Sequence, residues 1–204
     1  MDLAAALDLL DWKRRVFALY GDVRAAPDPQ AAWAHWRSVR DELFAHHPQT
    51  PLADSDRASL SGLAYYDYDP AARVAATVEK LPPESRDVPS SGPAPIMFDR
   101  IGIARFALGG TERALELFWL SGYGGGLFLP FRDGTSGSET YGGGRYLLDT
   151  VKGADLGMVG DGLRLDFNFS YHPSCSYQPN WVCPLAPVAN TLELPLRAGE
   201  RTRS

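Results

Sequence analysis

The stretch FRDGTSGSETYGGGRY, residues 131 to 146, concentrates side chains that could bind or transform a small molecule. Arginine suits bidentate binding of a carboxylate or phosphate group, and nearby acidic side chains can orient such a ligand. The triple glycine permits a turn whose backbone N–H groups form an anion-binding concavity. We predict one catalytic candidate here, Glu139, and five ligand-binding residues: Arg132, Asp133, Tyr141, Arg145 and Tyr146.

A second polar group follows in LRLDFNFSYH, residues 163 to 172, where polar and apolar side chains alternate. The alternation predicts a strand with Asp166, Asn168 and His172 on one face. That face either contacts water or lines the mouth of a barrel, and both arrangements give the same pattern. We add Asn168, Tyr171 and Trp181 to the predicted binding residues. Asp166 is the second catalytic candidate, because two carboxylates in different environments can divide the acid and base roles.

The cluster of arginines and carboxylates has a structural alternative. A buried arginine needs a carboxylate beside it, so Arg132, Asp133, Glu139 and Arg145 could form an internal salt-bridge network that ties strand ends together. The segment lacks the Walker and G-x-G-x-x-G spacings of nucleotide-binding loops. It also lacks the G-x-S-x-G motif of a nucleophile elbow.

Two cysteines, Cys175 and Cys183, lie in the proline-rich stretch HPSCSYQPNWVCPLAP. The pattern favours small buried thiols packed under a rigid loop. A disulfide between them is an alternative. A metal site that uses His172 with both thiols is another, but the paired C-x-x-C spacing of structural zinc sites is missing. We therefore predict no metal site.

Composition and charge narrow the class of protein. The 204 residues are 45% hydrophobic and 22% charged, which is ordinary for one globular domain. A net charge of -5 provides no basic surface for nucleic acid. The N-terminal charge order is the reverse of a secretory signal, and no apolar run is long enough to span a membrane. We predict a cytoplasmic protein without nucleic-acid or membrane partners.

The pattern of apolar residues changes along the chain. Helical spacing over residues 3 to 23 and again over residues 30 to 48 predicts two amphipathic helices, the second capped by Asp28 before Pro29. From residue 60 on, about eight short strands follow, joined by tight turns such as Gly109 to Thr111. We predict that residues 81 to 95, which are rich in proline, form a loop.

These elements predict an α+β fold that is mainly β. We expect an antiparallel β-barrel or curled sheet of about eight short strands, with the two N-terminal helices packed outside. We expect the whole chain, residues 1 to 204, to form one domain, with a helical segment at 1 to 48 and the β core at 60 to 200.

Two long motifs resemble an uncharacterised bacterial and archaeal family, domain of unknown function 1684. They are LFLPFRDGTSGSETYGGGRYL and LDFNFSYHPSCSYQPNWVCPLAPVANTLELPLRAGE, and the resemblance extends over roughly residues 36 to 200. It implies no assigned activity. Family members commonly carry Asn where this chain has His172, which implies a polar neighbour there rather than an essential base.

Taken together, the sequence predicts a β-barrel protein that binds a small anionic or carbonyl-bearing molecule in an arginine and carboxylate pocket. Hydrolysis through Glu139 and Asp166 is the enzymatic version of this hypothesis. The alternatives are a binding module without catalysis, and a structural or interaction protein whose charged cluster pairs internally. The sequence specifies neither the substrate nor a cofactor.

Overall fold

Two long helices begin the computed structural model, which describes residues 2–122 and 124–203. Helix α1 spans Leu3–Ala25 and helix α2 spans Pro29–His46. The Asp28 carboxylate accepts a hydrogen bond from the N–H group of Gln30 at 2.9 Å, and Pro29 lies in the first turn of α2. The predicted cap is confirmed, because the carboxylate satisfies an N–H group that has no partner within the helix. A short third helix, α3 (Asp54–Ala58), was not predicted.

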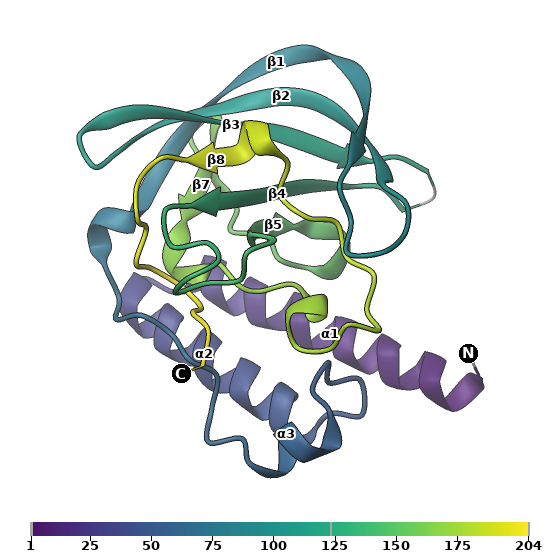
Figure 1. Cartoon of the computed structure of the whole chain (residues 1–204). Coiled ribbons are helices and arrows are strands. Elements are labelled where there is room, and N and C mark those ends of the chain that lie inside the picture. Colours follow the sequence, from purple (N-terminus) through teal and green to yellow (C-terminus); the bar gives the residue numbers. More distant parts are fainter. Residues whose placement is uncertain (1, 123, 204) are drawn as a thin grey trace.

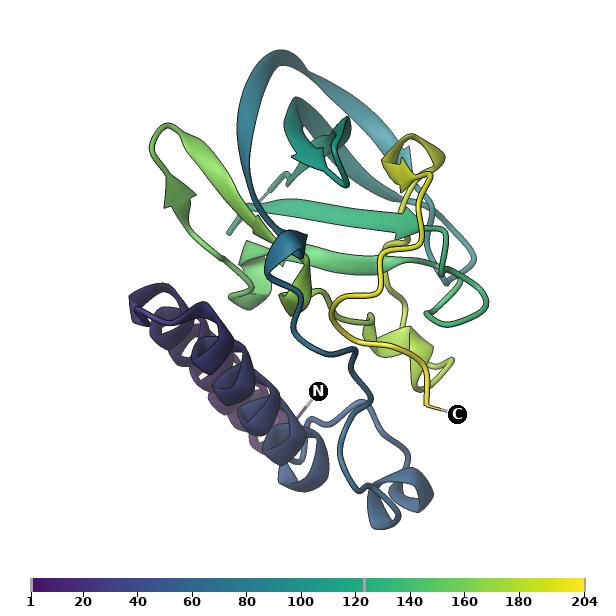
Figure 2. The same cartoon turned by 90° about the vertical axis from the view of Figure 1, so that its left-hand side faces the viewer.

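The remaining elements form a curled, mostly antiparallel sheet. Its strands are β1 (Arg73–Val88), β2 (Ile96–Leu108), β3 (Thr111–Leu120), β4 (Gly126–Asp133), β5 (Arg145–Asp149), β6 (Met158–Val159), β7 (Gly162–Asp166) and β8 (Thr191–Leu192). The order is β5-β4-β3-β2-β1-β7-β6, and β8 pairs in parallel with β4. The sheet forms a half-barrel with the helices packed against it (Figures 1 and 2). The predicted fold class, mainly β with a curled sheet and outer N-terminal helices, is confirmed.

The main hydrophobic core lies between the helices and the sheet. Trp36 of α2 is fully buried, and its ring packs edge-on against Tyr65 and Phe169 at centroid distances of 5.5 and 5.4 Å. The fully buried residues of α1 lie near its C-terminal end: Leu19, Tyr20 and Val23. Trp12 and Val16 pack against the core while partly buried, whereas Leu3, Leu7 and Leu10 are exposed. None of the described helices is both long enough and apolar enough to cross a lipid bilayer.

The prediction of a loop over residues 81 to 95 is wrong for the first half of that range. Strand β1 continues to Val88, and it bends where its register with β2 shifts between Lys80 and Glu84. Pro82 and Pro83 lie within this irregularity. Proline cannot donate to a ladder of hydrogen bonds, so a bulge is where a strand tolerates it.

The strand predicted over residues 163 to 172 ends early, at Asp166. A 3-10 turn, Phe167–Phe169, follows directly after Asp166 in place of the predicted strand. The Asp166 carboxylate accepts a hydrogen bond from the N–H group of Asn168 at 3.1 Å, and this local bond competes with the extended conformation. The predicted alternation is therefore wrong beyond Asp166, and Asn168 is fully buried. Between residues 62 and 70 the chain forms one isolated bridge, Tyr65 with Glu200, rather than a strand.

Candidate functional site

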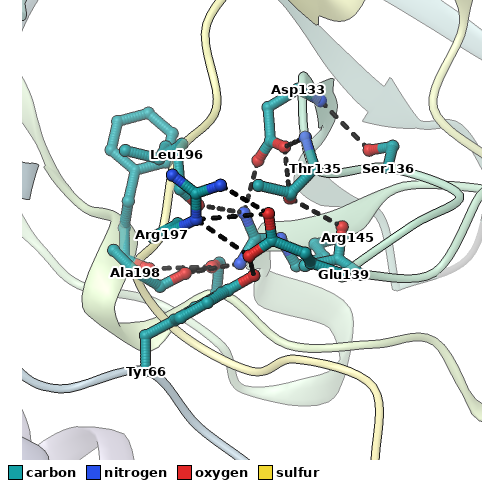
Figure 3. A network of polar contacts seen from close by, with 12 residues as sticks. Tyr66, Asp133, Thr135, Ser136, Glu139, Arg145, Leu196, Arg197 and Ala198 are labelled. Carbon is teal, nitrogen blue, oxygen red and sulfur yellow. Dashed lines mark hydrogen bonds and ion pairs between the residues drawn. The ribbon is translucent and has the colours of Figure 1, made fainter. Parts of the chain in front are cut away.

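Arg145 and Asp133 form a buried ion pair between β5 and β4. Their side chains are 1% and 0% exposed. The two terminal nitrogens of the guanidinium also donate to the backbone carbonyls of Leu196, Ala198 and Glu200 (Figure 3). Burial lowers the pKa of Arg145, and the adjacent carboxylate opposes that shift. The pair thus joins two strands to the C-terminal segment and directs its hydrogen bonds to protein atoms.

Gly144 allows this geometry. Its φ is +95°, and a Cβ atom built there would lie 2.6 Å from the Phe131 carbonyl oxygen and 2.7 Å from the Ala186 Cβ. A side chain at position 144 would therefore displace β4 or the loop that carries Ala186. The glycine-rich turn approaches backbone of its own chain at this point.

Glu139 and Asp166 belong to separate networks. The Glu139 carboxylate accepts two hydrogen bonds from the Arg197 guanidinium, at 2.7 and 2.9 Å, and one from the Tyr66 hydroxyl at 3.0 Å (Figure 3). The Arg197 hydrogen bonds lower the pKa of Glu139. Asp166 lies 3.5 Å from Arg73, and burial raises its pKa. Across residues 2–122 and 124–203, the two carboxylates share no hydrogen-bond partner.

The other predicted binding residues are distributed over the sheet and the proline-rich loop. Tyr146 and Tyr171 exchange backbone hydrogen bonds of 2.9 and 3.1 Å, and both line a small cavity of about 80 Å³. The Tyr146 hydroxyl donates to the Pro184 carbonyl. Arg132 lies on β4, opposite Thr191 of β8. Trp181 is half-buried, and its carbonyl accepts the Ser91 hydroxyl at 3.0 Å.

A second buried charged cluster centres on Glu200. Its carboxylate accepts hydrogen bonds from the Arg40 guanidinium at 2.7 Å, from the backbone N–H group of His172 at 3.1 Å and from the Tyr177 hydroxyl. Arg40 also donates to the Tyr65 hydroxyl at 3.1 Å. The side chains of Arg40 and Glu200 are 12% and 2% exposed. The cluster therefore ties α2, the proline-rich loop and the C-terminal segment together with neutral net charge.

One ring nitrogen of His172 is hydrogen-bonded, and the other faces a carboxylate. Its Nε2 atom accepts a hydrogen bond from the backbone N–H group of Tyr141 at 3.2 Å, so the neutral ring carries its proton on Nδ1. Nδ1 faces the Glu200 carboxylate at 3.7 Å. Burial lowers the pKa of His172, and the Glu200 charge only partly opposes this. The ring is neutral at pH 7 and positions the Tyr141 backbone.

A cavity of about 540 Å³ opens directly over this cluster. Four segments surround it: the region from Leu52 to Ala64, Tyr141 of the glycine-rich turn, the loop from His172 to Tyr177, and residues Glu200 to Arg203. The volume lies in the range of small-molecule sites. The cavity thus brings together one predicted binding residue, Tyr141, and His172 from the predicted polar row.

The cavity wall combines aromatic, aliphatic and charged groups. Arg201 and Arg203 contribute positive charge and Asp56 negative charge. None of the three takes part in an ion pair within the described part of the chain. Such a wall can bind a polar molecule. Within the same residues, no group of three or more His, Cys, Asp or Glu side chains could hold a metal ion.

Sequence reasoning missed Glu200, Arg40 and Tyr177 as members of this site. One signal was available for Arg40, because it is four residues from both Trp36 and Phe44 on the apolar face of α2. The structure stacks its guanidinium over both rings, at 4.8 and 5.1 Å. A charged residue among buried aromatic rings indicates a buried partner. No local pattern identified Glu200 as that partner, since 160 residues separate the two.

Comparison with known proteins agrees with the resemblance of the two motifs. The family model described as "Protein of unknown function (DUF1684)" matches residues 58–201. The chain belongs to this family. It is also similar to an uncharacterized protein of Haloarcula marismortui whose solution NMR structure shares 38% identity and a TM-score of 0.60. The match covers 81% of this chain and 90% of that chain. No curated protein matches the sequence.

Proposed function

We propose that this member of the family is a binding module for a small molecule with an anionic or carbonyl group. The ligand occupies the cavity between Tyr141, Tyr177, Glu200 and Arg201. One observation carries the proposal: a cavity of about 540 Å³ meets a polar floor whose side chains are already oriented by mutual hydrogen bonds. A floor of this kind needs little reorganisation when a ligand binds, and therefore costs little entropy.

The charges at the rim favour an acceptor-rich ligand. Arg201 and Arg203 contribute two guanidinium groups against the single carboxylate of Asp56. The floor itself is neutral, because Arg40 compensates Glu200 at 2.7 Å. A guanidinium binds a carboxylate or carbonyl oxygen through parallel N–H donors. The expected ligand thus presents its oxygen atoms to the two rim arginines.

Binding is favoured over catalysis because the groups with suitable chemistry are already engaged. His172 Nε2 accepts from the Tyr141 N–H group, Nδ1 lies 3.7 Å from the Glu200 carboxylate, and that carboxylate accepts from Arg40 and Tyr177. A general base needs a free lone pair within reach of its substrate. Hydrolysis by Glu139 and Asp166, and a cytoplasmic location, stay predictions. We assign a structural role to the Arg145 and Asp133 pair.

The proposal is tested by thermal unfolding in the presence of small carboxylic acids, keto acids and their matched amides. A true ligand at about 100 times its Kd adds about 2.7 kcal/mol of stability. For a chain of 204 residues this raises Tm by roughly 5 to 10 °C. We expect acids and keto acids to cause the shift and their amides to cause less.

Two variants show where the ligand binds. Arg201→Gln removes a rim charge and should abolish most of the Tm shift. Arg105→Gln is the matched control, because that arginine forms an exposed pair with Glu79 at 2.7 Å on strand β2, outside the cavity. The proposal is wrong if no probe stabilises the protein, or if both variants respond to the probe as the unaltered protein does.

A further inference from the structure

The two cysteines of the proline-rich loop lie against each other. The backbone N–H group of Cys175 donates to the Cys183 sulfur at 3.4 Å, although eight positions separate them in the sequence. Both thiols are free. The chain contains two cysteines in all, so this is a pair without competitors. Cys175 lies in the middle of the 3-10 segment Ser174–Ser176 and is buried there.

The surroundings make the two sulfurs unequal. The Tyr141 hydroxyl lies 3.7 Å from the Cys175 sulfur and can donate to it. The neighbouring Cys183 thiol lowers the pKa of Cys175, and the pKa of Cys183 is raised in turn. Cys175 is 9% exposed and Cys183 is 3% exposed. Cys175 is thus the less buried residue of the pair, and its lowered pKa makes its sulfur the better nucleophile.

A second segment holds Cys183 in place. Its N–H group donates to the Ser91 hydroxyl at 3.0 Å, and its carbonyl accepts the Ser91 N–H group at 2.9 Å. Trp181 is bound to the same serine, whose hydroxyl donates to the Trp181 carbonyl at 3.0 Å. These contacts fix the backbone on either side of Cys183. When a disulfide forms, the segment that carries Cys175 would therefore move slightly, and the loop would not need to unfold.

We propose that Cys175 and Cys183 are a dithiol that hydroperoxides oxidise, with Cys175 as the attacking thiolate and Cys183 as the resolving thiol. This function is independent of ligand binding. It shares one residue with the cavity, since Tyr141 contacts the Cys175 sulfur with its hydroxyl and also lines the cavity. Tyr141 thus lies between the thiol pair and the cavity and contacts both.

The reaction is written in two steps. In the first, the Cys175 thiolate attacks the terminal oxygen of the hydroperoxide, an S–O bond forms and the O–O bond breaks. Sulfur is oxidised by two electrons to a sulfenic acid, while the peroxide is reduced to an alcohol, or to water from hydrogen peroxide, after its oxygen takes up a proton. In the second, the Cys183 sulfur displaces the hydroxyl group, which leaves as water with the thiol proton, and an S–S bond forms.

The experiment uses the full chain, fully reduced and then treated with hydrogen peroxide. Remaining thiols are alkylated in urea, and the intact mass is measured. We expect a monomer that has lost two hydrogens and accepts no alkyl group, and a dithiol reductant should restore both alkylation sites. The same treatment of protein already unfolded in urea should oxidise more slowly, because the contacts around Cys175 are lost.

Variants assign the two roles. Cys183→Ser should accumulate a sulfenic acid on Cys175 that dimedone traps as one adduct, whereas Cys175→Ser should give no adduct and keep a reduced Cys183. Tyr141→Phe should slow the first step several-fold, because it removes a donor to the thiolate. The proposal is overturned if folded protein reacts no faster than unfolded protein, if the disulfide joins two chains rather than one, or if dimedone labels Cys175→Ser as readily as Cys183→Ser.

Discussion

Replacing Arg145 with methionine tests the buried ion pair at the centre of the glycine-rich segment. The substitution leaves the Asp133 carboxylate, whose side chain is 0% exposed, without its cation. It also removes the donors to the carbonyls of Leu196, Ala198 and Glu200. Removing one partner of a buried pair costs about 3 to 5 kcal/mol. Each of the three buried carbonyls left unsatisfied adds about 1 kcal/mol, so we expect a total loss of about 6 to 8 kcal/mol.

The loss is large against the stability of a typical domain, which is about 5 to 15 kcal/mol. Equilibrium unfolding in urea, followed by tryptophan fluorescence, measures it. Arg197→Met is the matched control, because Arg197 pairs with Glu139 in the same network (Figure 3) but is 59% exposed. An exposed pair is screened by water and salt, so this variant should lose much less. Equal losses in the two variants would refute the reasoning that burial makes the Arg145 pair essential.

Two further predictions concern the histidine and the glycines of the site. Burial holds the pKa of His172 below its ordinary value of 6.5, so below that pH the unfolded chain binds a proton that the folded chain does not. The free energy of unfolding should therefore fall as the pH decreases from 6.5, by at most about 1.4 kcal/mol per pH unit. In a series of urea-unfolding measurements at different pH values, His172→Asn should reduce this dependence. An unchanged dependence in the variant would show that the ring is protonated in the folded protein. Gly144→Ala should cost roughly 2 to 4 kcal/mol, from its positive φ and the contact with Phe131. In Gly142→Ala the nearest atom would be 3.6 Å from the new Cβ, so its Tm should hardly change, and similar Tm values for both variants would contradict the steric argument.

Several elements could be predicted because their causes are local. The cap of α2 depends on Asp28 and Pro29, which are neighbours in the sequence. The hairpin between β2 and β3 depends on Gly109 and Gly110, whose φ angles of +62° and +74° suit glycine, and the predicted turn is confirmed. Such signals act over a few residues and are visible in the sequence.

The site was harder to predict, because neither burial nor a partner distant along the chain leaves a local signal. Arg145 and Asp133 are twelve residues apart, and their proximity in sequence suggested a cluster, but not that the pair would be sealed from solvent. Asp166 illustrates a different difficulty. Its alternating neighbours predict a strand up to residue 172, yet strand β7 ends at Asp166, whose carboxylate accepts a hydrogen bond from the N–H group of Asn168 in the turn that follows.

The sequence by itself determined the class of fold, the family, and the presence of polar side chains in two segments, since these follow from periodicity, turn residues and motifs. Only the tertiary structure decided which of those side chains face a cavity. Glu200 shows the reason. Whether its carboxylate is a free ligand group or the centre of a buried cluster depends on Arg40, 160 residues away, and on the way that α2 packs under the sheet. Burial and pairing are properties of the packed molecule, and no short stretch of the chain contains them.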